Sequence, residues 1–98
     1  MNHQSAIERA LAGHSDRVIE PMANIGARLD ELIARRAEYV QRVANQAKHD
    51  AVPMAMIVAN LRAAEIAAAQ IGVLSEALRD ALRSHGALKV YAEARASA

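Results

Sequence analysis

The sequence predicts an all-α protein: an antiparallel helical hairpin of two long helices, completed to a four-helix bundle by dimerisation. Hydrophobic residues make up 53% of the chain but only two residues are aromatic, and Ala, Leu, Arg and Glu, which favour helices, dominate. Apolar residues also recur at steps of three and four. With 98 residues we expect a single helical domain. Its parts are a first arm over 6–47, a second arm over 51–85, and a tail or short helix over 87–98.

The first arm contains two residues that disturb a helix. Ser5 and Glu8 fit a capping box, with Ser5 as the N-cap. Gly13 then weakens the helix and Pro21 removes one backbone donor. Two interpretations stay open: a short helix over 6–12 followed by a new one, or one helix that is kinked or split near Pro21.

Beyond this disturbance the first arm is a long amphipathic helix with coiled-coil-like spacing. Its outer face carries charges of both signs at steps of three and four, which indicates a solvated ladder of salt bridges. Its apolar stripe consists of Met22, Ile25, Leu29, Leu32, Arg36, Tyr39 and Val43.

A tight turn over 48–52 is predicted between the two arms. Lys48 and His49 are basic residues at the end of the first arm, where the helix dipole favours positive charge. Asp50 is a suitable N-cap for the second arm, and Pro53 falls in its first turn. A short connection makes the two helices antiparallel neighbours.

The second arm contains the most unusual stretch, residues 51–75, where Arg62 and Glu65 are the only charges. A helix that is apolar on nearly every side must be buried from more than one direction. Its polar interruptions disfavour a membrane span. Gly86 follows this arm as an expected C-cap.

We therefore predict an interface with a second copy of the chain, with another helical protein, or with both. One hairpin seam cannot cover Met56, Val58, Ile66 and Val73, nor Ile19, Ile33 and Val40 of the first arm. Arg36 and Glu65 are expected to form a buried polar pair that fixes the register. The predicted interface residues are Met54, Met56, Ile57, Leu61, Ile66, Ile71, Val73 and Leu74.

No pattern in the sequence indicates an enzyme, a cofactor or a metal. The hairpin brings His14 and His85 near Asp16, but no His-x-x-x-His or Glu-x-x-His pair supports a metal site. The glycines are scattered, so there is no phosphate-binding loop; Gly26 and Gly72 are expected to mark a close helix crossing. We therefore predict no catalytic, no cofactor-binding and no metal-binding residues.

The net charge, the cysteine content and the N-terminus limit the kinds of partner and the cellular compartment that we expect. A net charge of +1 is too balanced to predict nucleic acid as the main partner. There is no cysteine, so disulfides are excluded. The N-terminus has neither a basic region nor a continuous apolar one, so no secretory signal is predicted and a cytoplasmic location is expected.

In size and layout, with helices rich in Leu and Ala around the turn 49–53, the chain resembles small bacterial helical hairpins. These are the needle subunits and hairpin co-chaperones of type III secretion systems. It is also similar in length to the secreted hairpins of type VII systems, but it lacks their Trp-x-Gly turn. The resemblance implies a bacterial adaptor or co-chaperone. The alternative is a structural or exported subunit of a secretion or phage assembly, and a DNA-binding regulator ranks below both.

Overall fold

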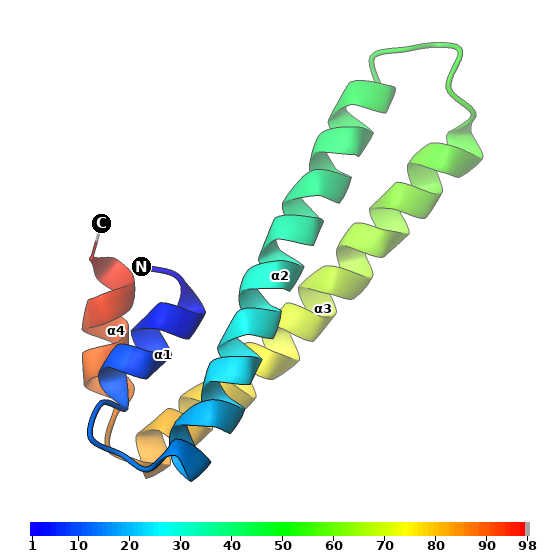
Figure 1. The fold of residues 1–98 in the computed structure, drawn as a ribbon. Helices are drawn as coiled ribbons and strands as arrows, with labels where there is room; N and C mark the ends of the chain where they lie inside the picture. The colour runs from blue at the N-terminus through cyan, green and yellow to red at the C-terminus, as the bar shows by residue number, and fades with distance from the viewer. Residues whose placement is uncertain (98) are drawn as a thin grey trace. The chain divides into compact units, whose positions relative to one another are not determined.

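The computed structural model describes residues 1–97, and all the regular structure in that range is α-helical, which confirms the predicted class. The chain forms two compact units. The terminal unit comprises Met1–Asp30 and the chain from Val73 onward, and the central unit is Glu31–Gly72. The single domain over 1–98 stays a prediction. The helices are α1 (His3–Ala10), α2 (Asp16–Gln46), α3 (Met54–Ser84) and α4 (Leu88–Ala96) (Figure 1).

The N-cap of the first helix is Asn2 and not Ser5. The Asn2 side chain accepts a hydrogen bond from the Ser5 backbone N–H at 2.9 Å, so α1 begins at His3 and Ser5 lies inside it. The prediction at Ser5 was wrong because Asn, which caps as well as Ser, stands three residues earlier.

The first arm is split at Gly13 and not near Pro21. Gly13 has a φ of +93°, in the left-handed region that favours glycine, between the end of α1 and the start of α2. Pro21 lies inside α2, which continues to Gln46. Pro21 removes one hydrogen-bond donor but does not end the helix. Of the two interpretations left open by the sequence, the structure therefore shows the short helix followed by a new one.

The terminal unit contains a hydrophobic core built from all four helices. The α1 and α4 helices pack against each other, and Tyr91 and Ala94 of α4 are buried. A Cβ built on Gly26 of α2 would lie 2.5 Å from Ile7 Cδ1 and 3.0 Å from the Gln4 backbone, so glycine allows α1 to approach α2. The largest fully buried side chains are Ile7, Leu11, Leu29, Leu78 and Leu82.

Gly86 ends α3, as the sequence predicts. Its φ is +67°, the Gly86 N–H donates to the Arg83 carbonyl at 3.0 Å, and the Ala87 N–H donates to the Leu82 carbonyl at 2.9 Å. This pair of hydrogen bonds is the Schellman motif. The chain then continues into α4, so the helical alternative for 87–98 is the one observed for its described residues.

In the central unit, residues 47–53 connect α2 to α3. Asp50 lies within this connection and not at the helix cap, because α3 begins at Met54, directly after Pro53. The Asn60 side chain of α3 donates to Gln46 Oε1 of α2 at 3.0 Å. This hydrogen bond links the two helices beside the connection.

Candidate partner interface

The central unit has almost no hydrophobic core of its own. Its buried residues are Leu32 of α2 and Ala64 and Ala67 of α3, and only Leu32 is large. A set this small removes little apolar surface from water. The central unit therefore lacks the packing that holds the terminal unit together.

The large apolar side chains of the central part of the chain are instead exposed. Met54 is 70% exposed, Ile66 54% and Val58 45%, which is unusual for such residues in an isolated globular chain. The sequence identified most of this set, because the three-four stripe leaves the other helix faces without cover. On α3 the exposed large residues are Met54, Met56, Val58, Leu61, Ile66 and Val73, and on α2 they are Ile33 and Val40.

The predicted interface residues fall into two groups in the isolated chain. Ile57, Ile71 and Leu74 are half-buried, and Ile57 and Ile71 lie on the same side of α3 as the buried alanines. The exposed group is Met54, Met56, Leu61, Ile66 and Val73. Val58 was not among the predicted interface residues but is also exposed. Ile19 is half-buried in the terminal unit.

One side of α3 gathers most of the exposed apolar residues. Each residue turns an α-helix by about 100°, so positions spaced by three, four, seven or eleven return to one face. We call this surface the outer face of α3. All of its members are exposed: Met54, Val58, Leu61, Arg62, Glu65, Ile66, Ala69 and Val73.

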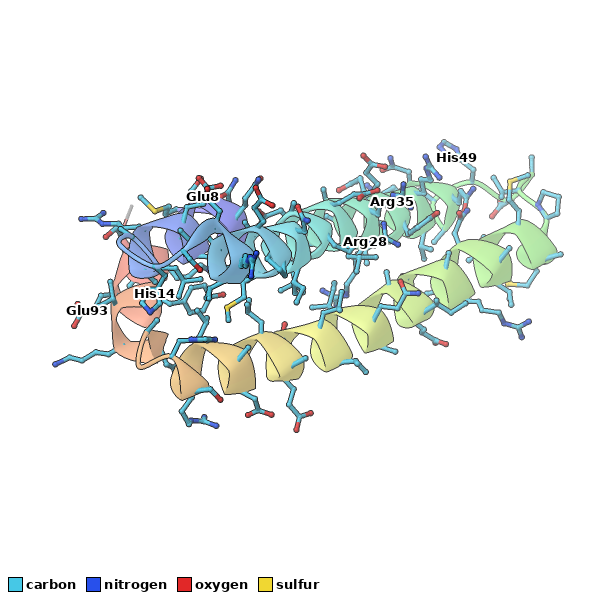
Figure 2. The ribbon with its side chains drawn as sticks, turned by 60° about the horizontal axis from the view of Figure 1, so that its bottom comes forward. Glu8, His14, Arg28, Arg35, His49 and Glu93 are labelled. Carbon is cyan, nitrogen blue, oxygen red and sulfur yellow. The ribbon has the colours of Figure 1, made fainter. Side chains whose placement is uncertain are left out.

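Arg36 and Glu65 are both exposed in the single chain, so burial of this pair stays a prediction. Arg36 lines a shallow hollow of 280 Å³ with Ile33 of α2 and residues 68, 71 and 72 of α3. The outer charges of α2 include the Glu31–Arg35 ion pair at 2.7 Å, as expected for a solvated ladder. Figure 2 labels Arg28 and Arg35 among the side chains of α2.

In the terminal unit, Asp30 of α2 caps the start of α1. Its Oδ1 accepts from the His3 N–H at 2.9 Å and its Oδ2 from the Gln4 N–H at 3.1 Å, while His3 Nδ1 lies 2.9 Å from Oδ1. Partial burial opposes the charge, but the hydrogen bonds from the Gln4 and His3 backbones together with the His3 side chain outweigh it, so the pKa of Asp30 lies below its ordinary value. No pattern in the sequence signals this long-range cap.

A cavity of 570 Å³ in the same unit is lined by basic side chains. Arg95 donates to the Met1 carbonyl at 2.6 Å, Arg83 donates to Asp80 at 3.1 Å, and His3 contacts Asp30. Tyr91 also lines the cavity, and burial raises its pKa although Arg95 and Arg79 act in the opposite direction. Three of the basic groups that line the cavity therefore already have partners within the chain.

The two histidines that the sequence placed together are neighbours. The ring centroids of His14 and His85 are 5.9 Å apart, with the rings edge to face. Within residues 1–97, no group of three or more His, Cys, Asp or Glu side chains could hold a metal ion. The contact between His14 and His85 is therefore explained as packing between two exposed rings.

By length and composition alone, α3 could also cross a membrane. In its most apolar window only 11% of the residues are buried within the chain, so this helix lacks the cover that a core helix has. Length and apolar composition are weak evidence for a span. The low burial of its apolar residues establishes that α3 presents apolar surface to its surroundings.

The fold and this surface define an all-helical chain with an exposed apolar helix face. No protein-family model, curated protein or solved structure matches the chain. The proposal for its function therefore rests on its own residues.

Proposed function

We propose that this chain is a non-enzymatic protein–protein interaction module, in which α2 and α3 form an antiparallel hairpin that self-associates through the outer face of α3. The observation that supports the proposal is the exposed apolar surface of α3, in a central unit that has almost no hydrophobic core. Two copies would together form a four-helix assembly. The same surface would suit a second, helical protein, as an adaptor or small co-chaperone in a bacterial cytoplasm requires.

The energies are consistent with a reversible dimer. Burying the exposed part of one such side chain yields on the order of 1 kcal/mol. Five large residues on each outer face would then contribute on the order of 10 kcal/mol, comparable with the cost of association, about 4–15 kcal/mol. A dimer of this kind is expected to dissociate on dilution.

A protein partner is favoured over a lipid bilayer by the position of two charges. Arg62 and Glu65 lie near the middle of the apolar stretch and are exposed. A charged side chain at the centre of a bilayer costs about 2.5–3.5 kcal/mol on insertion scales. Between two proteins the same charges can pair with each other. Nucleic acid is not proposed as a partner, because Glu31 and Glu38 dilute the arginines of α2.

Sedimentation velocity over a range of micromolar concentrations tests this proposal. We expect a concentration-dependent dimer, weakened by Ile66→Ser on the outer face of α3. Val40→Ser on α2 is the matched control, because Val40 is 49% exposed and Ile66 54%.

Three outcomes would contradict the proposal. A folded monomer at every concentration would show that the chain does not self-associate. Open-ended polymers would favour the structural or exported subunit. Flotation of the chain with phospholipid vesicles would show that a membrane covers α3.

A further inference from the structure

We infer that the occupant of the outer face of α3 is a second copy of the same helix, running antiparallel, related by a two-fold axis that lies between the two helices at the level between Ala63 and Ala64. This inference rests on the proposed function and adds the orientation and register. It begins from Arg62 and Glu65, the only charges between Ala51 and Ser75. They have opposite signs and stand one on each side of that midpoint.

The outer face of α3 is symmetric about this point. A two-fold axis perpendicular to a helix places each residue opposite the residue equally far on the other side of the axis. At about 100° per residue, two such positions also deviate by equal and opposite angles from the centre of the outer face. They therefore lie at the same level along the two helices, and they face each other directly only where they are close to that centre. Val58 with Ala69 and Arg62 with Glu65 lie within about 30° of the centre, whereas Met54 with Val73 and Leu61 with Ile66 lie at opposite edges of the contact.

These pairs are chemically complementary. Arg62 of each copy lies opposite Glu65 of the other, so a dimer gains two ion pairs within an apolar surround. Val58 meets the small Ala69, so the centre of the contact can pack closely, and Leu61 and Ile66 flank this centre at its two edges. A parallel dimer would instead place Arg62 against Arg62 and Glu65 against Glu65.

The antiparallel register also determines which apolar residues stay outside the contact between the two copies. The half-buried and buried residues Ile57, Ala64 and Ile71 lie on the other side of α3. In the central unit the two α3 helices would thus lie innermost and the α2 segments outermost. Ile33 and Val40 of α2, as well as Met56, remain outside the contact, and four helices lie in a row rather than in a square bundle.

Cysteine cross-linking tests the register directly, because the natural chain has no cysteine. The full-length double variant Val58→Cys/Ala69→Cys should form covalent dimers on mild oxidation. Neither Val58→Cys nor Ala69→Cys alone should do so, because each residue lies about 16 Å along the axis from its own copy, beyond the reach of a disulfide. Covalent dimers from Val58→Cys alone would overturn the antiparallel register.

Charge reversal provides a second test that does not depend on oxidation. Arg62→Glu or Glu65→Arg should each weaken dimerisation on the order of 10- to 100-fold, and Arg62→Glu/Glu65→Arg should restore it. The matched control reverses Asp80 and Arg83, an exposed pair with the same spacing at 3.1 Å, and should leave the dimer unchanged.

These experiments distinguish the antiparallel register from self-association itself. A dimer that is indifferent to these charges, or whose double variant is not rescued, contradicts the register but leaves self-association standing. A natural chain that stays monomeric contradicts both.

Discussion

At the scale of residues, the most informative position is Asp30, which holds α1 against α2. Replacing it with Ala removes hydrogen bonds to two backbone N–H groups at the start of a helix. We expect Asp30→Ala to lower the free energy of unfolding by about 1–3 kcal/mol. Urea denaturation measures this, with Asp80→Ala as the exposed control.

The same carboxylate predicts how stability depends on pH. The folded-state pKa of Asp30 lies below its unfolded value. Its contribution is therefore present above the unfolded pKa, near about 4, and is lost as the pH falls through the folded pKa. Unfolding measured from pH 7 to pH 2 should show a weaker acid dependence in Asp30→Asn than in the natural chain. An unchanged dependence would contradict the role of Asp30.

Two helical glycines form a matched pair of substitutions. A Cβ at Gly26 would meet Ile7 and the backbone of Gln4, whereas a Cβ at Gly72 would meet nothing within 4 Å. We expect Gly26→Ala to cost about 1–3 kcal/mol. Gly72→Ala should gain up to about 1 kcal/mol from helix propensity. Thermal unfolding of the two variants, measured at concentrations too low for association, gives these changes in stability. Equal changes in the two variants would contradict the close approach of α1 to α2.

At the scale of elements, the end of α3 depends on the backbone of Gly86. Its positive φ disfavours any residue with a Cβ, except that Asn tolerates it better. Gly86→Ala should lower the free energy of unfolding by about 1–2 kcal/mol, and Gly86→Asn by less. Denaturation curves of the two variants decide this, and an equally stable Gly86→Ala would exclude the Schellman motif as a stabilising feature.

The elements also show what the sequence could predict. Helix class, the cap at Gly86 and the exposure of Val58 and Ile66 follow from local spacing, which the sequence displays directly. The position of the break, at Gly13 or at Pro21, does not follow from local spacing, because both residues weaken a helix. Only the packing of α1 on α2 selects the break at Gly13. The cap supplied by Asp30 joins residues far apart in sequence, so no local pattern reports it.

At the scale of the whole molecule, the central feature is the contrast between the two units. The terminal unit buries Leu29, Leu78 and Leu82 completely, while the central unit buries one large side chain, Leu32. In the proposed dimer, the central unit obtains its missing cover from a second copy of α3. Its stability should therefore depend on concentration, while that of the terminal unit should not.

Amide hydrogen exchange at several protein concentrations tests this claim most directly. Above the dissociation constant, the amides of α3 in the central unit, such as those of Ala64 and Ala67, should exchange slowly, and on dilution they should exchange faster. Amides near Ile7 and Leu82 in the terminal unit should keep their rates. Protection of the central α3 amides that is the same at every concentration would contradict the account, because the central unit would then be stable without a second copy.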